Sequence, residues 1–554
     1  MKFSDLLLFR DKCDKCDTNI LRQSFRVCPT LPYFTVLIRL SIINYQFTRL
    51  LSKKIITFVP RKQKNMAENT NQLPHPLVAA IPLLTLISLI ALIIVYVPDD
   101  ALSGASQLAM VLATAVCVGI SIIANKMSWE RFEMAIQATV GDAAVSVLIL
   151  LMIGMMSSAW MISGVVPTLI YYGVQLMSPM FFLPCACIIS SLISVMTGTS
   201  WTTIATIGIA LMGISGALGI PPALSAGAII SGAYFGDKMS PMSDTTVLAS
   251  SMAKADLFSH IRYMTYTTVP SITVSLLLYL LIGLKFGGQA PEISQYVDAL
   301  DGTFNITLWT MLVPAFTGYL IYRKVPSLVT LTLSALAACL CAVVLQPDVV
   351  AGIGGEGEMT APALLKGIMK TCYTSTHVDT GAEAINSLVA TRGMVGMMGT
   401  VWLVICALCF GACMVTSNML QSLTNVMLRA IKGTVSLVAG TVVSGVLFNM
   451  IMGDQFLSII MNASIFRKEY HERGYRPELL SRSTEDSSTV TSVLIPWTAC
   501  GMTQSTILGI PTVVYLPFCF FNLISPLMSC LVAALGFVPT PEKKPSGEQP
   551  STPS

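Results

Sequence analysis

Residues 236–246 read Gly-Asp-Lys-Met-Ser-Pro-Met-Ser-Asp-Thr-Thr and follow directly on the apolar stretch 223–235. The glycine and the proline in this run release a helix from its regular hydrogen bonding. Backbone freed in this way survives at membrane depth only where protein or a water-filled cavity covers it. The run therefore predicts a broken helix whose interruption lies inside a membrane protein.

The rest of the chain has the composition of an integral membrane protein. Apolar residues make up 54% of the 554 positions and charged residues 11%, whereas a soluble domain carries roughly 25% charged residues. These numbers exclude a soluble enzyme built around one core. We predict an all-α, polytopic protein with about 11–12 transmembrane helices, some of them broken. Runs that approach or reach the length of a membrane span are 76–97, 143–162, 269–284, 326–345 and 394–413.

Three further polar interruptions lie inside apolar sequence. Burial favours the neutral form of a carboxyl group and a nearby cation favours the charged form, so an acid in such a break holds either a proton or a sodium ion. Competition between the two ions at one alternating site is exchange. The three breaks are 197–203, 453–455 and 483–491, and together with 236–246 they contain the acids Asp237, Asp244, Asp454, Glu485 and Asp486.

Hydroxyl groups in the same breaks supply hard oxygen ligands of the kind that alkali cations accept. We expect Na⁺ at Asp244 and Asp454 in particular. For Asp237 the alternative is an ion pair with its neighbour Lys238, and for Glu485 it is a solvated pair with Arg482. The hydroxyl candidates are Ser243, Thr245, Thr246, Thr199, Ser200 and Thr489.

An internal repeat is visible at an offset of 242 residues. Gly154-Met-Met recurs as Gly396-Met-Met, and Ser243-Asp-Thr-Thr recurs as Glu485-Asp-Ser-Ser. The loop charges predict that the two copies run in opposite directions through the membrane. Inverted repeats with polar breaks at corresponding positions are typical of secondary transporters, whose binding site lies between the halves near the midplane. We place the repeats at about 125–285 and 360–535.

The charges of the connecting loops predict the orientation. Short basic loops stay in the cytoplasm. Arg323-Lys324 and the cluster 467–482 are basic, whereas 292–301 and 348–358 are rich in acids. The polar C-terminal tail, 541–554, is then cytoplasmic.

The N-terminal stretch 1–65 differs from the rest, because it holds 13 Lys or Arg residues against four Asp. It lacks the continuous apolar core and the cleavage site of a signal peptide. Met66 opens a short polar tail directly before the first long apolar run. We expect 1–65 to be a basic leader, either disordered or added by a misassigned start, and 66–540 to form the transporter domain.

Several motifs are similar to those of one transporter family. On them the chain resembles the NhaC family of Na⁺/H⁺ antiporters, within the ion transporter superfamily, over roughly residues 75–535. The most specific motif is 231–241, Ser-Gly-Ala-Tyr-Phe-Gly-Asp-Lys-Met-Ser-Pro, followed at once by Ser243-Asp-Thr-Thr. The other matching runs are 160–167, 197–203, 260–262, 453–455, 481–482, 485–486, 489–492, 494–497 and 500–501.

The resemblance implies a multi-pass antiporter of the bacterial cell (inner) membrane that exchanges Na⁺ for H⁺ by alternating access. It implies no enzymatic activity and no cofactor beyond the transported ions. The implied partners are Na⁺, H⁺ and the lipid bilayer, without nucleic acid, and a homo-oligomer is compatible with the pattern. Some relatives couple Na⁺ and H⁺ to organic anions, such as malate against lactate, or to amino acids.

Two positions depart from the family pattern. The family usually has Asn after the Asp-Thr-Thr run, where this chain has Val247, and Asn after Pro-Trp, where it has Thr498. Each change removes an amide that could coordinate a cation or bind a substrate. Thr498 keeps one oxygen and joins the candidate ligands, whereas Val247 keeps none. The carboxylates are intact, so we expect cation coupling, with the transported solute open between Na⁺ alone and an organic anion or amino acid.

Overall fold

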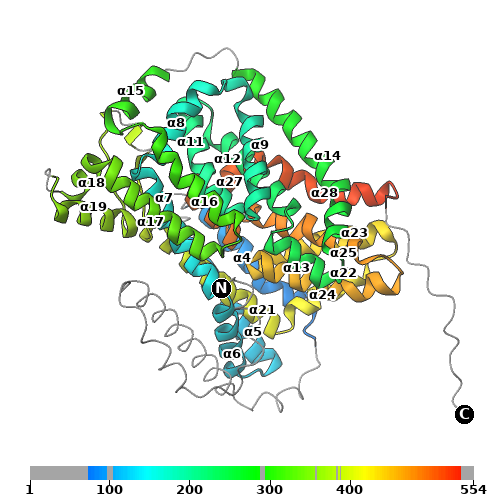
Figure 1. Ribbon diagram of the computed structural model, residues 1–554. Helices are drawn as coiled ribbons and strands as arrows, with labels where there is room; N and C mark the ends of the chain where they lie inside the picture. Colours follow the sequence, from blue (N-terminus) through cyan, green and yellow to red (C-terminus); the bar gives the residue numbers. More distant parts are fainter. Residues whose placement is uncertain are drawn as a thin grey trace, which may run out of the picture. The chain divides into compact units, whose positions relative to one another are not determined.

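The computed structural model describes residues 73–96, 104–286, 293–355, 359–381, 385–386 and 389–537. The chain divides between Gln72 and Leu73 into two units, and every described residue belongs to the second. The predicted leader, 1–65, and tail, 541–554, lie outside the described residues. Within the described part the chain is helical, without a named strand and with one isolated bridge between Thr376 and Thr391. The all-α prediction is confirmed (Figure 1).

The described helices follow one another with short connections. The first described helices are α4 (Pro76–Tyr96), α5 (Ser106–Asn125) and α6 (Trp129–Asp142). What we call the first half comprises α7 (Ala144–Ile162), α8 (Val165–Leu176), α9 (Pro179–Thr197), α10 (Ser200–Thr203), η4 (Ile204–Gly208), α11 (Ile209–Ala217), α12 (Pro222–Met239), α13 (Asp244–Ala253) and α14 (Leu257–Gly283). Next in the chain come η5 (Leu284–Phe286), α15 (Ile293–Thr303), η6 (Leu308–Met311), α16 (Leu312–Tyr322), α17 (Ser327–Leu345), α18 (Pro347–Gly354), α19 (Ala361–Tyr373) and η7 (Val395–Met397). What we call the second half comprises α21 (Met398–Thr416), α22 (Met419–Arg429), α23 (Thr434–Met452), α24 (Gln455–Glu472), α25 (Pro477–Thr484), η8 (Glu485–Thr489), η9 (Ser492–Leu494), α26 (Ala499–Leu508), α27 (Thr512–Tyr515), η10 (Leu516–Phe518) and α28 (Phe520–Ala534).

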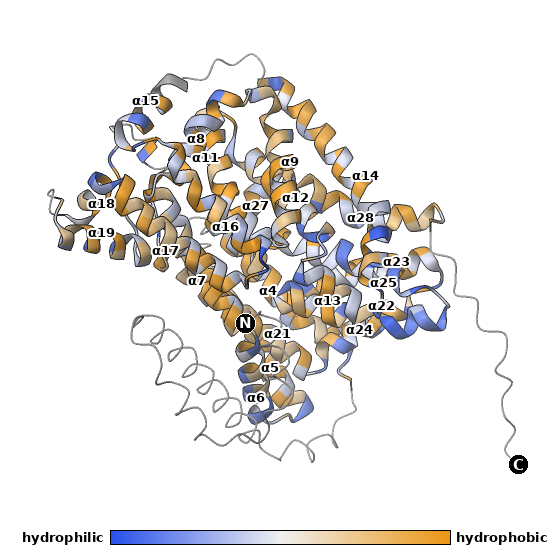
Figure 2. Ribbon diagram, in the orientation of Figure 1, coloured by the Kyte–Doolittle hydropathy of each residue, from blue (hydrophilic) through white to orange (hydrophobic). Residues whose placement is uncertain are grey.

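Nine helical segments in the described part are long and apolar enough to cross a membrane. Two bent pairs, Tyr296–Thr303 with Leu308–Tyr322 and Thr512–Phe518 with Phe520–Ala534, raise the number to eleven if each pair is one span. Large apolar side chains such as Leu281 and Leu340 are exposed on these helices, and α14 and α17 are largely apolar (Figure 2). The chain is therefore a multi-pass membrane protein.

The order of the helices repeats along the chain, at an offset longer than the one predicted from the motifs. The 19-residue helices α7 and α21 begin at Ala144 and Met398, and the 19-residue helices α9 and α23 begin at Pro179 and Thr434. Residues with positive φ mark the same corners in both halves. The pairs, all with one common spacing, are Gly198 with Gly453, Gly219 with Gly474, and Lys254 with Gly509.

The offset predicted from the sequence is wrong for the helices. Ser243 is the N-cap of α13, and at the spacing of the positive-φ pairs its counterpart is Thr498, the N-cap of α26. The prediction had paired Ser243 with Glu485, because it compared similar side chains, whereas the fold repeats the positions at which the backbone leaves the helix. The inverted relation of the two halves stays a prediction.

Two glycines bring α12 close to α9. A Cβ atom added at Gly232 would lie 2.1 Å from the Cys187 carbonyl oxygen, and one at Gly236 would lie 2.4 Å from the Ser191 carbonyl oxygen. Contacts this short require glycine, and small residues of this kind let membrane helices pack backbone to backbone. The consequence is local: Asp237, next to Gly236, lies beside the break at which α9 ends.

The breaks themselves follow from glycine and proline. Helix α9 ends at Thr197 because Gly198 takes φ +70°, and α10 begins again at Ser200 after the extended residue Thr199. In the second half Gly453 takes φ +65°, and its carbonyl oxygen accepts a hydrogen bond of 2.7 Å from the Ala499 amide. The break after α23 is thus joined directly to the break before α26.

Candidate ion-binding site

Asp237, near the C-terminal end of α12, is held by three donors from two breaks. Its Oδ2 accepts hydrogen bonds from the Ser200 amide at 3.0 Å and the Ser200 hydroxyl at 2.7 Å. Its Oδ1 accepts one from the Ser243 hydroxyl at 2.6 Å. The carboxylate is buried and lies at the N-terminus of α10, where free amides and the helix dipole favour negative charge. The first half therefore holds a carboxylate in place between its two breaks.

Glu485 supplies a second buried carboxylate from the other half. It begins η8, a π-helical turn, and the Thr489 hydroxyl one turn later donates to its Oε2. Its Oε1 lies 3.4 Å from the Thr246 hydroxyl, which also lies 3.0 Å from the Lys238 carbonyl oxygen. Single π-helical turns occur often at functional sites. Thr246 thus links the broken helix of the first half to Glu485.

Asp486 forms an ion pair with Lys238 across the two halves, and both side chains are fully buried. The Thr267 and Ser525 hydroxyls donate to the same Asp486 Oδ1 at 3.2 and 3.1 Å. The second oxygen of Asp486, Oδ2, lies 3.8 Å from Nε of Arg482, which is also fully buried. The Arg482 guanidinium stacks over a tyrosine ring, with its central carbon 4.6 Å from the centroid of Tyr263.

The charges of this buried cluster do not balance. It contains three carboxylates, Asp237, Glu485 and Asp486, and two cations, Lys238 and Arg482. With all five groups ionised the cluster carries one negative charge in excess. An uncompensated buried charge costs several kcal/mol, so the cluster favours binding one further cation. A proton on one carboxyl group or an alkali ion between oxygen ligands would each satisfy it.

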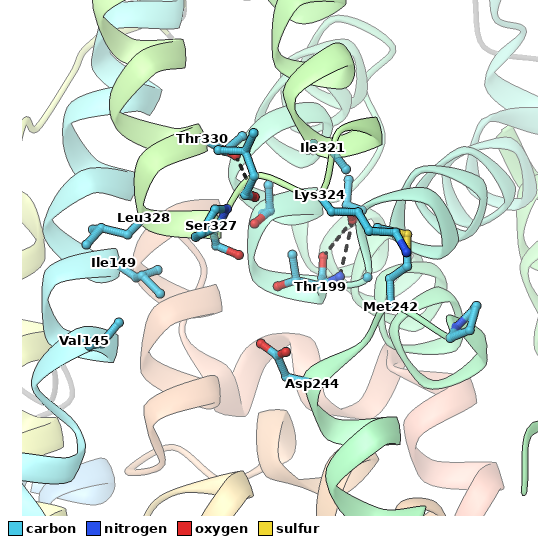
Figure 3. Close-up of a pocket in the computed structure, with 16 residues that line it drawn as sticks. Val145, Ile149, Thr199, Met242, Asp244, Ile321, Lys324, Ser327, Leu328 and Thr330 are labelled. Carbon is cyan, nitrogen blue, oxygen red and sulfur yellow. Dashed lines mark hydrogen bonds between the residues drawn. The ribbon is translucent and has the colours of Figure 1, made fainter. Parts of the chain in front are cut away.

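A cavity of about 470 Å³ lies at the two breaks of the first half and is lined by residues of both. Asp244 is exposed and points into the cavity across from Thr199 and Ser327 (Figure 3). Ser200 and Ser243, whose hydroxyls donate to Asp237, are each next in the sequence to a residue that lines this cavity. The polar and charged residues that line the cavity are Thr197, Thr199, Thr202, Asp244, Lys324, Ser327 and Thr330.

A second cavity of about 240 Å³ lies further along α7. Ile149 lines the first cavity and Gly154 lines the second; the two lie five positions apart, which at 1.5 Å per residue is about 7.5 Å of helix. Only a short part of α7 therefore separates the ends of the two cavities. The polar and charged residues that line the second cavity are Ser157, Ser158, Thr391, Arg392 and Thr506.

Comparison with known proteins adds the family. The family model described as the Na⁺/H⁺ antiporter family matches residues 232–537. The Na⁺/H⁺ antiporter NhaC of Alkalihalophilus pseudofirmus is 34% identical over 425 residues, which are 76% of this chain and 89% of that protein. The chain belongs to the Na⁺/H⁺ antiporter family. The resemblance predicted from the sequence motifs is thereby confirmed.

Two further relatives have similar identity to the chain but different names. The Na⁺/H⁺ antiporter NhaC of Bacillus subtilis is 33% identical over 417 residues, covering 74% of this chain and 87% of that protein. The malate-2H⁺/Na⁺-lactate antiporter of the same organism is also 33% identical, over 401 residues that cover 72% of this chain and 82% of that protein. Antiporters named for cations and for organic anions are thus equally similar to the chain.

In this member of the Na⁺/H⁺ antiporter family, most of the predicted site residues lie together in the buried cluster. Asp244 and Thr199 lie on the wall of the first cavity rather than in the buried cluster. Residues of the cluster and its hydrogen bonds are Asp237, Ser200, Ser243, Thr245, Thr246, Glu485, Asp486 and Thr489.

Asp454 and Thr498 lie outside this cluster, and each caps a helix. Asp454 is the N-cap of α24, where its Oδ1 accepts a hydrogen bond of 3.0 Å from the Leu457 amide. Thr498 is the N-cap of α26, donates to the Ser492 carbonyl oxygen at 2.5 Å and accepts from the Gly501 amide at 3.0 Å. The predicted Na⁺ ligands Asp244 and Asp454 therefore do not share one hydrogen-bonded cluster.

Two predicted alternatives are wrong. Lys238 does not pair with its neighbour Asp237 but with Asp486, because the helical end of α12 turns successive side chains in different directions. Glu485 is not solvated: it is fully buried, and Arg482 lies beside Asp486 one helical turn away.

Sequence reasoning missed the hydroxyls of Thr267 in α14 and Ser525 in α28, which donate to Asp486. Both helices hold further hydroxyl side chains, so nothing in a single sequence marks these two. Lys238 and Arg482, in contrast, do stand out in the sequence, because an ionisable residue at membrane depth is usually functional and paired. These two hydroxyl members of the buried cluster thus required the structure.

Proposed function

We propose that the chain exchanges Na⁺ for H⁺ by alternating access, with Asp237 and Glu485 as the carboxylates that hold the transported ion. The observation that carries the proposal is the buried cluster of three acids and two bases, which carries one negative charge in excess when all five groups are ionised. Lys238 and Arg482 both face Asp486, so Asp237 and Glu485 are the two acids of the cluster that are left without an ion-pair partner in it. A site of this kind binds one H⁺ or one Na⁺, and the two compete.

The hydroxyls around the two acids suit either ion. A hydroxyl that donates to a carboxylate keeps two acceptor lone pairs. The Ser200, Ser243 and Thr489 hydroxyls, each bonded to one of the carboxylates, therefore present oxygen atoms to a cation at the same place. When a proton binds instead, these hydroxyls need only rotate. Exchange requires no other chemistry from the protein.

The two cavities support access from both sides. The first is next to the basic pair Arg323-Lys324, which the positive-inside rule assigns to the cytoplasm, and the second lies at the other end of α7. We place the protein in the bacterial cell membrane with its C-terminus cytoplasmic. Movement of one half against the other would open the cluster to each cavity in turn.

A second candidate is exchange coupled to an organic anion. Among the described residues, those that line the second cavity include an exposed Arg392 and no acid, and a guanidinium binds a carboxylate through two parallel hydrogen bonds. One relative of equal identity is named for malate and lactate. Val247 and Thr498, which replace two amides expected in the family, are consistent with a solute other than Na⁺ alone.

The test uses purified protein in liposomes that contain a pH-sensitive dye. Wild type should move protons when Na⁺ is added, and Asp237→Asn and Glu485→Gln should each lose more than about 99% of that flux, because one neutral amide abolishes the competition. The matched control is Asp348→Asn, an exposed acid in the first turn of α18, which should keep the full flux. Full flux in both cluster variants would refute the assignment.

The same liposomes separate the two candidates. Labelled malate, lactate and amino acids are added on one side with and without Na⁺. Counterflow of a labelled anion that disappears in Arg392→Gln, while Na⁺-driven proton movement alone is absent in wild type, would favour the organic-anion exchanger. Proton flux with Na⁺ and without any organic anion supports simple cation exchange.

A further inference from the structure

A third cavity of about 490 Å³ lies away from the ion-binding cluster, among the end of α13, the second half of α24 and the start of α25. Its volume is within the roughly 300–1,000 Å³ typical of small-ligand sites. Four of its described lining side chains are basic or histidine, and none is acidic. The residues that line it are Ala253, Lys254, Ser464, Arg467, Lys468, Tyr470, His471, Tyr475, Pro477 and Leu480.

The positive charges of this cavity are not neutralised by buried partners among the described residues. Lys468 is 3.7 Å from Glu472, but both side chains are largely exposed, at 83% and 58%, and such a pair contributes about 0–1 kcal/mol. Arg467 donates through Nη1 to the Met252 carbonyl oxygen at 3.3 Å. That contact fixes the guanidinium at the cavity and leaves it charged, with further N–H donors of its five available.

The aromatic wall of the cavity is rigid. The Tyr470 hydroxyl is hydrogen-bonded to that of Thr441 at 2.9 Å, and the Tyr475 hydroxyl to that of Thr434. The two tyrosine rings lie 6.2 Å apart, centroid to centroid. The cavity is thus a preformed concave surface that combines hydrogen-bonded tyrosines with exposed basic and histidine side chains.

We propose that this cavity binds a phosphate-bearing anion. Several Lys and Arg side chains that converge without an acid form the usual recognition surface for phosphate. The positive-inside rule assigns the cluster 467–482 to the cytoplasmic side, where basic pockets between helices bind anionic lipid headgroups and where free phosphate compounds are also present. The shared chemistry is the phosphate group, and its source is decided by the experiment below.

The occupant would connect the far ends of three helices whose near ends carry the breaks. Helix α13 begins at Asp244, α24 follows Asp454, and α25 runs directly into Glu485. A ligand that holds Lys254, Arg467 and the start of α25 together fixes these helices relative to one another. Regulation of exchange by the occupant rests on the proposed function, whereas binding itself does not.

The binding test uses the full-length protein purified in detergent and in nanodiscs. Thermal unfolding is measured with inorganic phosphate or pyrophosphate against chloride at equal ionic strength. It is then measured in nanodiscs of phosphatidylcholine alone and with phosphatidylglycerol or cardiolipin added. Arg467→Gln and Lys468→Gln should each lower the affinity for the stabilising anion about fivefold, since one such charge contributes about 1 kcal/mol near a surface. The matched control is Arg429→Gln, an exposed basic residue on α22 outside the cavity.

The two sources give different outcomes. Stabilisation by phosphate in detergent that is lost in the two cavity variants identifies a free phosphate compound, and stabilisation by anionic lipid only identifies a headgroup. No stabilisation in wild type, or an equal effect in Arg467→Gln, Lys468→Gln and Arg429→Gln, overturns the proposal. Proton flux measured in parallel tells the two hypotheses apart: a binding defect with normal Na⁺-driven flux leaves the exchange function intact, and absent flux with normal binding contradicts only the exchange function.

Discussion

Lys238 and Asp486 show how much depends on single residues at this depth. Both are fully buried, and each is the main counter-ion of the other. Removing one partner of a buried ion pair leaves an uncompensated charge, which costs far more than the pair itself contributes. Arg482, 3.8 Å from the free oxygen of Asp486, offsets only part of that cost, because the contact is too long for a hydrogen bond.

We therefore expect Lys238→Met to lower the free energy of unfolding by about 3 kcal/mol, the lower end of the range for a broken buried pair. Adding Asp486→Asn should restore roughly 0.5–3 kcal/mol of the summed loss, the range of coupling measured for contacting residues. Thermal or denaturant unfolding in detergent measures both, with the exposed Lys432→Met as control. Strict additivity of the two substitutions would show that the pair does not exist.

Asp244 has a different environment and should behave differently. It is exposed on the wall of the first cavity, so we expect its charge to attract cations toward the site rather than to hold them. We expect Asp244→Asn to raise the KM for Na⁺ roughly fivefold, the effect of about 1 kcal/mol of screened attraction, with kcat within about twofold. Lys324→Gln, on the same cavity, should shift KM in the opposite direction, and both shifts should shrink at high ionic strength. A collapse of kcat at unchanged KM would instead put Asp244 among the ion ligands.

At the residue scale, then, the sequence predicted which residue types form the site but not which side chains contact each other. The acids and hydroxyls of the breaks were visible, because polar groups inside apolar sequence stand out. The partner of Lys238 lies 248 residues away, and nothing in a single sequence distinguishes Asp486 from Asp237 as its counter-ion. Asp454 was predicted as a cation ligand for the same reason. In the structure it caps α24, and its role as a ligand stays a prediction.

At the scale of elements, the broken helices depend on close backbone contact. Gly198 takes φ +70°, and a Cβ atom there would lie 2.8 Å from both the carbonyl carbon and oxygen of Met242. The two breaks of the first half are thus pressed against each other. That contact keeps Ser200 and Ser243 on opposite oxygens of Asp237.

Gly198→Ala should therefore damage both stability and transport. The left-handed conformation alone costs an alanine about 1–2 kcal/mol, and the clash with Met242 adds to it. The matched control is Gly219→Ala, where φ is +68° but nothing lies within 4 Å of an added Cβ. Unfolding and proton flux are measured for both variants, and Gly219→Ala should lose only the conformational part and keep its flux. Equal losses in the two variants would mean that the close approach of the breaks is unimportant.

The positions of the helix breaks could be predicted from the sequence, but which break of one half corresponds to which break of the other could not. Gly and Pro interrupt helices by known rules, so 197–203, 236–246 and 453–455 could be located from the sequence. The repeat was assigned its shorter offset because Ser243-Asp-Thr-Thr resembles Glu485-Asp-Ser-Ser. Helix ends and positive φ angles repeat at a longer one, which pairs Gly198 with Gly453, and neither property can be read from similar side chains.

At the scale of the whole molecule, the two cavities on α7 make alternating access testable. Ser327 lines the first cavity, next to the basic pair that predicts a cytoplasmic position, and Ser157 lines the second. If the cluster is reached from one side at a time, the two cavities open to opposite faces of the membrane. A membrane-impermeant thiol reagent should then label Ser327→Cys only from the cytoplasmic side and Ser157→Cys only from the other.

Sodium should change the two labelling rates in opposite directions, because an ion that stabilises one open state must close the other. The native cysteines of the described residues are buried or half-buried, so unmodified protein in inside-out and right-side-out vesicles gives the background. Labelling of both variants from the same side would contradict the predicted orientation and the two-sided path. Labelling from opposite sides at rates that Na⁺ does not change would instead describe a protein with two vestibules and no coupling between them, because a ligand without different affinities for two states cannot shift their populations.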